Sequence, residues 1–280
     1  MIRLALRVRR DDAEVALAEL LELAPRGVEE RDLGDVVEYA VYGAPGELPA
    51  LPDLRAAAGA ALVDVSTQEV ADDWHERWRE FHRPVEISGP GPGVRRLHVR
   101  APWHPACTDP TAIDLVVDPG QAFGTGAHAT TRLCLELLLE LEPGGALVDL
   151  GCGSGILGIA AARLGWDPVT AVDHERESVR ATDENAAANG VRLTAVRHDL
   201  VHDGPGPSAP TVVANLLAPL LLRVARDGPA GAERPRALIA SGLLRAEAGD
   251  VGQALAAGFG LQEAQRRHSG EWAALLLTEA

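Results

Sequence analysis

The sequence predicts an α/β fold in which a doubly wound, mostly parallel sheet of seven strands follows a small ferredoxin-like α+β domain. From about residue 110 onward, short buried strand patterns alternate with helix patterns, which is typical of βαβ units and a parallel sheet. Near the end, residues 259–268 and 272–278 form two strand patterns joined by Ser269-Gly270. This hairpin would add an antiparallel edge to the sheet.

The first 66 residues have the pattern of a separate unit. Residues 2–8 largely alternate apolar and basic side chains, as in a strand with one buried face. The patterns that follow are a helix from Asp11 or Asp12 to Leu23, strands over 27–31 and 36–41, a helix over 51–58 and a strand over 61–65. The order βαββαβ predicts a ferredoxin-like sandwich, and we expect this unit to bind a partner.

Residues 67–109 are predicted to link the two domains. Trp74, Trp78 and Phe81 share one face of a helix expected over 72–82, an apolar stripe that would pack on a neighbouring domain. A loop rich in Pro and Gly is expected over 87–94, and a strand over 98–103.

The catalytic domain is predicted to span residues 110–280. Its expected helices cover 130–141, 156–164, 175–188 and 219–226, and its expected buried strands cover 146–150, 169–172, 193–197, 211–214 and 237–240.

Composition excludes several classes of protein. The net charge is −15 and the chain contains no Lys, so a phosphate backbone is not expected as the main partner, whereas a basic protein would suit. Three cysteines without a C-x-x-C pair indicate neither a disulfide framework nor a zinc cage. No apolar run reaches the length of a membrane span and no secretory signal is present, so the expected location is the cytoplasm.

A glycine-rich loop lies where the first buried strand turns into a helix. Gly151, Gly153 and Gly155 let the backbone approach a bulky ligand closely at the carboxyl end of the sheet. Asp173 ends the next strand, where a carboxylate can accept hydrogen bonds from ribose hydroxyls. The loop therefore predicts a nucleoside site.

Two nucleoside cofactors fit this loop. Gly153, Gly155 and Gly158 also match the G-x-G-x-x-G pattern of dinucleotide-binding proteins, with Asp173 at a suitable distance. S-adenosylmethionine is favoured by the mid-chain position of the loop, by the terminal hairpin, and by Asp149, an acid suited to a cofactor that bears an ammonium. Asp199 ends the third strand and either meets the adenine amine or caps a turn; the sequence leaves both open.

Two further segments would line the same cleft. The loop over 118–131 is rich in glycine, contains Phe123 and His128, and leads into a helix N-terminus, so it can supply donors to bound polar groups. Asn215 ends the fourth strand, where its amide oxygen can meet a substrate N–H and orient a lone pair toward a methyl group. Its alternative is to cap the next helix.

These motifs together resemble one family, the methyltransferases that modify the eleventh protein of the large ribosomal subunit. The resemblance runs almost from end to end. It rests on the segment Trp74/Trp78/Phe81/Pro84, Ala101-Pro102-Trp103, the DPG-x-AFGTG-x-H-x-TT loop (118–131), GCGSGIL (151–157), Asp173, Asn185, Asn189, Ala214-Asn215-Leu216-Leu217, Ser241-Gly242-Leu243-Leu244 and Glu271-Trp272.

The resemblance implies an N-methyltransferase that uses S-adenosylmethionine. It implies that the cofactor contacts Thr131, Gly151, Asp173 and Asn215, and we add Phe123 and Gly153 as candidates from their loops. It further implies that the N-terminal domain holds the ribosomal protein, whose α-amine and lysine side chains accept methyl groups.

The expected reaction is an in-line displacement in which Asn215 positions the amine. No metal is expected, because none of the nine His residues has a convincing ligand spacing. Three alternatives remain open: a methyltransferase of the same fold acting on another protein lysine or a small molecule, a nicotinamide-dependent oxidoreductase, and a binding protein without activity.

Overall fold

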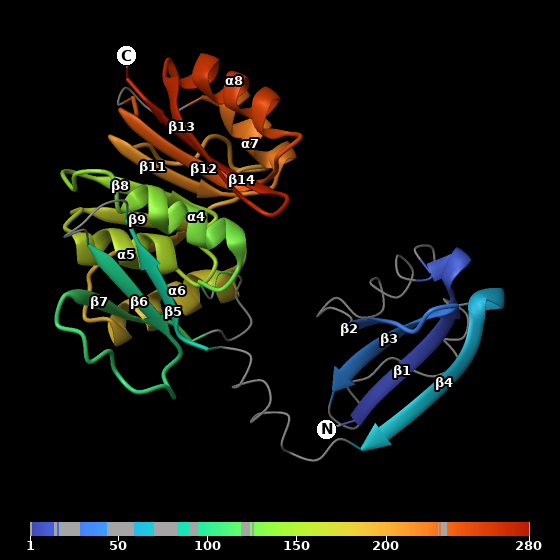
Figure 1. Ribbon diagram of the computed structural model, residues 1–280. Coiled ribbons are helices and arrows are strands. Elements are labelled where there is room, and N and C mark those ends of the chain that lie inside the picture. Colours follow the sequence, from blue (N-terminus) through green and yellow to red (C-terminus); the bar gives the residue numbers. More distant parts are fainter. Residues whose placement is uncertain are drawn as a thin grey trace. The chain divides into compact units, whose positions relative to one another are not determined.

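The computed structural model describes residues 2–13, 16, 29–43, 59–69, 83–89, 95–118, 124, 126–228, 230 and 234–279. The chain divides into two compact units, residues 1–81 and 82–280 (Figure 1). The helices expected over 51–58 and 72–82, and most of the one expected to end at Leu23, lie outside the described residues.

The first unit contains a four-stranded antiparallel sheet. Its strands are β1 (Ile2–Arg9), β2 (Glu29–Asp32), β3 (Val36–Gly43) and β4 (Leu62–Glu69), in the order β2-β3-β1-β4. Every neighbouring pair is antiparallel. This order and these directions are those of a ferredoxin-like sheet, so the strand part of that prediction is confirmed.

The alternation predicted for β1 separates an apolar face from a charged one. Leu4 and Val8 are buried in the apolar cluster of this unit. Glu38 of β3 is also buried, and its two carboxylate oxygens accept hydrogen bonds from Arg3 at 2.5 Å and Arg7 at 2.9 Å. These two guanidinium groups, with Arg3 making the largest contribution, lower the pKa of Glu38 below its usual value despite its burial.

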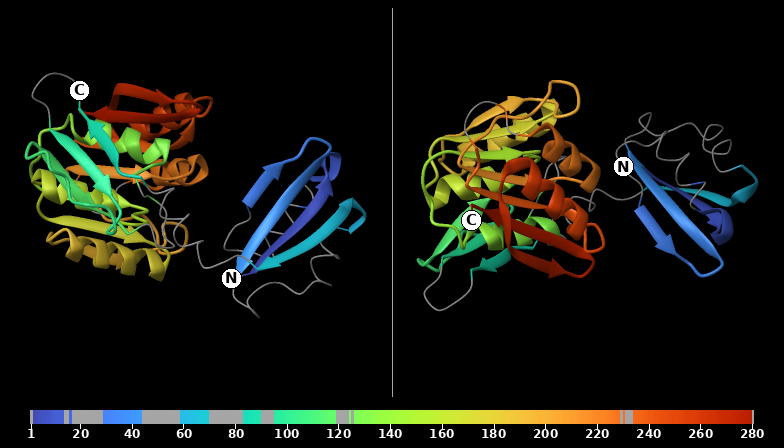
Figure 2. Two further views of the ribbon diagram at one scale, coloured as in Figure 1. Left: turned by 60° about the horizontal axis from the view of Figure 1, so that its bottom comes forward. Right: turned by 90° about the horizontal axis from the view of Figure 1, so that it is seen from above.

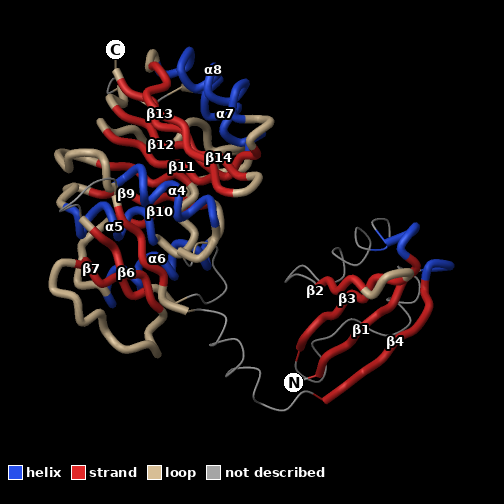
Figure 3. The backbone as a smooth tube through the Cα atoms, viewed as in Figure 1, coloured by secondary structure: helices blue, strands red, loops and turns tan. Residues whose placement is uncertain are grey.

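The second unit is built on a seven-stranded sheet. Its strands are β8 (Leu147–Leu150), β9 (Val169–Asp173), β10 (Thr194–Arg197), β11 (Thr211–Asn215), β12 (Ala237–Leu244), β13 (Gln262–Ser269) and β14 (Trp272–Thr278). The spatial order is β10-β9-β8-β11-β12-β14-β13, and only the pairs that involve β14 are antiparallel. The doubly wound, mostly parallel sheet and its antiparallel hairpin are therefore confirmed, and Figure 3 shows the strands of this sheet in red among the helices.

Helices cover both faces of this sheet (Figures 1 and 2). The helices are α4 (Ala129–Leu138), α5 (Ile156–Leu164), α6 (Arg176–Ala188), α7 (Ala218–Asp227) and α8 (Ala248–Phe259). One apolar core lies between the sheet and α4 and α5, and a second lies between the sheet and α7 and α8. The sequence patterns predicted no helix over α8. The hairpin expected to begin at Phe259 begins at Gln262, because Phe259 ends α8 and is buried in the second core.

A separate three-stranded sheet packs on the first core. It consists of β5 (Val85–Ser88), β6 (Arg96–Arg100) and β7 (Ala112–Val116), with β5 antiparallel and β7 parallel to β6. Ile87 and Leu115 are buried against α4 and α5. The loop expected from residue 87 is therefore wrong at its first two positions, since these pair with β6; residues 90–94 lie outside the described part.

Candidate functional site

The glycine loop connects β8 to α5 through backbone conformations that favour glycine. Gly151, Gly153 and Gly155 have φ values of 76°, 53° and 82°. A Cβ at Gly151 would lie 2.3 Å from a terminal carbon of Leu216. Side chains at these positions would therefore be strained, and at Gly151 one would collide with its neighbour. The loop adopts this conformation at the carboxyl end of the sheet because these three positions lack side chains.

Asp173 holds this loop from the end of β9. One of its carboxylate oxygens accepts a hydrogen bond from the Gly153 N–H at 3.0 Å, and the other accepts from the Glu175 N–H at 3.0 Å. The residue is 9% exposed, so a small part of it faces solvent. Each oxygen has a second lone pair, so the carboxylate can still accept hydrogen bonds from a ligand.

A cleft of about 440 Å³ opens beside the glycine loop. Its polar lining comes from Gly151, Gly153, Asp173, His174, Glu175, Ser178, His198, Asp199, His202 and Asn215, and its apolar lining from Val172, Leu200, Val201, Leu216 and Leu220. The structure thus places four of the predicted cofactor residues, Gly151, Gly153, Asp173 and Asn215, around one cavity. This volume falls within the usual range for a small-molecule site.

Asp199 lies at the rim of this cleft and also caps a turn. Its carboxylate accepts hydrogen bonds from the His202 ring at 2.8 Å and from the Val201 N–H at 2.7 Å. These bonds hold the pKa of Asp199 at about 2, so it is ionised near neutral pH. Asp199 therefore makes the turn-capping contacts that were one of its two predicted roles. Because it also lines the cleft, its carboxylate can still accept a hydrogen bond from a ligand.

Thr131 and Asn215 meet from different elements. Asn215, the last residue of β11, donates from its amide nitrogen to the Thr131 hydroxyl at 3.4 Å. Thr131 is in the first turn of α4 and is 1% exposed. It is not among the residues that line the cleft, so what the structure shows for it is the hydrogen bond to Asn215. Phe123 lies outside the described residues, so its predicted role stays a prediction.

The loop that precedes α4 is fastened to the glycine loop. Asn185 of α6 accepts a hydrogen bond from the Asp118 N–H at 2.9 Å and donates one to the Ser154 carbonyl at 2.9 Å. The Ser154 hydroxyl donates to the carbonyl of Gly124. His128 caps α4 by accepting from the Thr130 N–H, which agrees with an ordering role for this ring.

These bridging roles were not derivable from the sequence patterns. Only the family resemblance pointed to Asn185, because a polar residue within a helix is usually solvated. Burial is what distinguishes it: Asn185 is 3% exposed and connects two loops that lie more than 30 residues apart in sequence.

Asp149, predicted as an acid suited to the ammonium of the cofactor, lies elsewhere in the structure. The side chain is fully buried under the loop, and its Oδ2 accepts from the Gly158 N–H at 3.0 Å. Among the described residues, none provides a partner for its Oδ1. Burial raises the pKa of Asp149 to about 7, with Gly158 opposing the shift and Asp173 adding to it. Asp149 is not among the residues that line the cleft.

The residues present fit S-adenosylmethionine. The glycine loop lines the cleft with backbone at Gly151 and Gly153, and the carboxylate oxygens of Asp173 and Asp199 are acceptors for hydroxyl and amine groups. The neutral side chains of Asn215 and Leu216 form the neighbouring wall, where no charge opposes a cationic sulfonium.

The sequence of this chain is similar to those of known proteins over most of its length. A family model described as ribosomal protein L11 methyltransferase matches residues 51–280. The chain is 40% identical over 216 residues to the ribosomal protein L11 methyltransferase of Pelotomaculum thermopropionicum, a match that covers 75% of this chain and 67% of that protein. The protein belongs to the ribosomal protein L11 methyltransferase family.

A second relative and a solved structure carry the same family name. The ribosomal protein L11 methyltransferase of Pseudomonas paraeruginosa is 38% identical over 224 residues, which cover 79% of this chain and 74% of that one. The crystal structure of the ribosomal protein L11 methylase from Lactobacillus delbrueckii subsp. bulgaricus superposes with a TM-score of 0.57 at 29% identity, covering 65% of this chain and 93% of the other.

Membership in the L11 methyltransferase family decides between the two cofactor interpretations of the glycine loop. The protein is a methyltransferase, and its cofactor is S-adenosylmethionine, as the sequence predicted. The nicotinamide alternative is set aside. Within the described part of the chain, no helix combines the length and the apolar character needed to cross a bilayer.

Proposed function

We propose that this chain transfers methyl groups from S-adenosylmethionine to amine nitrogens of ribosomal protein L11, on lysine side chains, the N-terminal α-amine, or both. The single observation that supports it best is the position of Asn215, which ends β11 at the cleft and is held by Thr131 at 3.4 Å. The choice of ribosomal protein L11 as the substrate rests on the names of the relatives. The N-terminal sheet, in this proposal, holds the ribosomal protein.

Asp173 and the glycine loop bind the nucleoside part of the cofactor. Asp173 accepts hydrogen bonds from the ribose hydroxyls with the lone pairs that Gly153 and Glu175 leave available. Gly151 and Gly153 let the backbone approach the ligand without a side chain between them. When bound, the cofactor supplies a methyl group on a positively charged sulfur, which needs no further activation.

Asn215 orients the amine that receives the methyl group. Its amide nitrogen is committed to the Thr131 hydroxyl, which leaves Oδ1 as the acceptor for an incoming N–H. An amine held in this way keeps its lone pair in line with the methyl carbon, and such positioning is a main source of rate enhancement in bimolecular transfers.

The attacking amine must be neutral. An ordinary lysine has a pKa of about 10.4, so it must lose its proton before attack. A partly dry cleft next to a positive charge lowers that pKa, and the proton leaves to water. The apolar wall formed by Leu216 and Leu220 favours the neutral form of the amine.

Mass spectrometry of purified ribosomal protein L11 after incubation with the enzyme and S-adenosylmethionine tests the proposal. We expect mass increments of whole methyl groups, mapped by peptide fragmentation to lysine side chains or the α-amine. The Asn215→Ala variant serves as the matched control with the fold retained. Unmodified L11, together with transfer of labelled methyl groups to another protein or a small molecule in the same assay, would assign the chain a different acceptor.

A further inference from the structure

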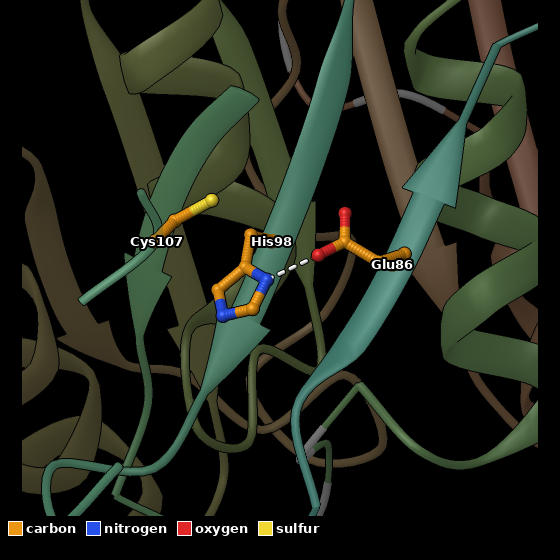
Figure 4. Close-up of side chains that lie close together, drawn as sticks. All are labelled: Glu86, His98 and Cys107. Atoms are coloured by element: carbon orange, nitrogen blue, oxygen red, sulfur yellow. Dashed lines mark hydrogen bonds and ion pairs between the residues drawn. The ribbon is translucent and has the colours of Figure 1, made fainter. Parts of the chain in front are cut away.

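Three potential metal ligands converge on the three-stranded sheet, away from the cofactor cleft. Glu86 lies on β5, His98 lies on β6, and Cys107 lies in the segment between β6 and β7 (Figure 4). Among the described residues, these three form a group whose ligand atoms all lie within 4.8 Å of one another.

The sheet register brings the first two together. Glu86 and His98 are direct partners in the antiparallel pairing of β5 and β6. The Nδ1 atom of His98 is in contact with a carboxylate oxygen of Glu86. Figure 4 shows the thiol of Cys107 on the other side of the imidazole ring. The three side chains therefore come from three separate stretches of chain, and their ligand atoms lie close to one another.

The segment that contains Cys107 is fixed to the sheet on both sides of the cysteine. The Cys107 thiol donates to the Asp109 carbonyl, with the sulfur and oxygen atoms 3.9 Å apart. Arg100 of β6 donates to both oxygens of Asp114, at 2.8 to 3.0 Å, and also to the His104 carbonyl at 2.8 Å. These contacts hold the thiol in place before any ion binds, as a preorganised site requires.

The same segment is fastened once more beyond Cys107. Arg96 donates to the Asp109 carboxylate at 2.5 Å and to the Thr111 hydroxyl at 2.6 Å. Neither arginine contributes a charge to the cluster, because each is paired with an aspartate outside it. The two ion pairs act as the outer contacts that orient the ligand-bearing backbone.

We propose that Glu86, His98 and Cys107 bind one divalent cation of the zinc class, with water as the fourth ligand. A thiolate and an imidazole are ligands that zinc prefers, whereas magnesium and calcium take oxygen ligands. Glu86 is 58% exposed and His98 14% exposed, so solvent reaches the site from one side and can supply the fourth ligand. On binding, the Cys107 thiol loses its proton to water and the carboxylate moves from the imidazole to the metal.

Sequence spacing does not reveal this site. The ligands are separated by 12 and 9 residues, unlike the short paired spacings of zinc motifs, and strand pairing is what brings them together. The bound ion would connect β5, β6 and the segment after β6, and so stabilise this sheet independently of the cofactor.

Cobalt and zinc titrations of the untagged, reduced, full-length chain test the proposal. We expect one Co²⁺ per chain to produce the charge-transfer absorption of a cobalt–thiolate bond and the visible bands of a tetrahedral ion, and Zn²⁺ to displace it. Cys107→Ser should abolish the charge-transfer band. His98→Gln should lower zinc affinity by at least about 100-fold, and Asp114→Asn by about 10-fold, as expected for an outer contact.

Matched variants separate this site from adventitious binding. His268→Gln removes an exposed histidine on β13 and should leave affinity and spectrum unchanged. Binding of S-adenosylhomocysteine should be equal in all variants, which shows that they fold and keeps the result independent of the proposed function. Zinc should also slow alkylation of Cys107. Failure to bind one ion per chain, or a cobalt spectrum that survives both Cys107→Ser and His98→Gln, would overturn the proposal.

Discussion

The two sides of the cofactor cleft differ in charge. On the side of β9 and β10, the lining is acidic and hydrogen-bonded, with Asp173 and Asp199 as its centre. On the side of β11 and α7, it consists of Asn215 and leucines, and Leu217 next to it is 69% exposed. A carboxylate binds hydroxyls well but would keep a nearby amine protonated. In the proposed function, the acidic side therefore binds the cofactor and the neutral side receives the amine.

Replacing Asp173 on the acidic side should have the largest effect. In the proposed function, Asp173→Ala removes the acceptors for two ribose hydroxyls, and it also removes the acceptor of the Gly153 N–H. Hydrogen bonds to a charged group are worth about 1.5–3 kcal/mol each, so the loss of two should lower affinity for S-adenosylhomocysteine by roughly 100-fold or more. Isothermal titration calorimetry measures this. Glu175→Ala, an exposed carboxylate in the same cleft, is the control and should change affinity a few-fold at most.

Asn215→Ala should affect the other side in a different way. The variant loses the acceptor that orients the amine but keeps Asp173 and the glycine loop, so kcat should fall about 100-fold while cofactor affinity changes little. Single-turnover rates and calorimetry separate the two effects. Wild-type turnover in this variant would remove Asn215 from the mechanism, and a parallel loss of cofactor affinity would instead place it on the cofactor side.

Asp149 lies on β8, the strand between the two sides, and should make stability depend on pH. Its folded pKa of about 7 exceeds the usual aspartate value of 3.8, so between these pH values the folded chain keeps a proton that the unfolded chain releases. The free energy of unfolding should therefore fall as pH rises from about 4 to 7, by up to about 1.4 kcal/mol per unit.

Asp149→Asn should flatten this slope, because an amide has no proton to release in that range. Denaturant unfolding at pH 5, 6 and 7 without cofactor measures it. Asp183→Asn, an exposed position on α6, is the control and should leave the slope unchanged. Equal slopes in the wild type and Asp149→Asn would mean that Asp149 is already ionised in the folded chain.

Leu217→Asp should produce the smallest change, by making the neutral side acidic. A carboxylate near the incoming amine favours its protonated form, so the pH of half-maximal rate should rise by less than about one unit. Leu217→Asn matches the size without the charge and should leave the pH profile in place. A profile that does not move in Leu217→Asp would indicate that the amine binds elsewhere.

Local patterns predicted most of the larger sheet because its strands are short, apolar and separated by amphipathic helices. Helix α8 was missed because its glycines oppose helix propensity. The structure explains them: a Cβ on Gly258 would lie 2.0 Å from the Ala225 carbonyl oxygen, and one on Gly252 would lie 3.0 Å from Glu263. These glycines allow close packing against α7 and β13, a tertiary requirement that no local pattern shows.

The site was predictable to the extent that its residues end strands. Gly151, Asp173 and Asn215 were found because the carboxyl ends of parallel strands meet at one edge. The contact between Asn215 and Thr131 joins residues 84 positions apart, and the hydrogen bonds of Asn185 join loops from different βα units. Such contacts depend on how helices pack on the sheet, so the sequence could name the residues but not their partners.

The insertion of β14 between β12 and β13 constrains the order of assembly. During synthesis β13 emerges before the strand that must separate it from β12, so the outer part of the sheet cannot form in the order of translation. Until β14 arrives, β12 presents an unpaired edge with buried-type residues such as Ile239, a template for intermolecular pairing. We therefore expect a chaperone that binds nascent strands to reduce aggregation most during the interval after β12 is synthesised and before β14 is complete.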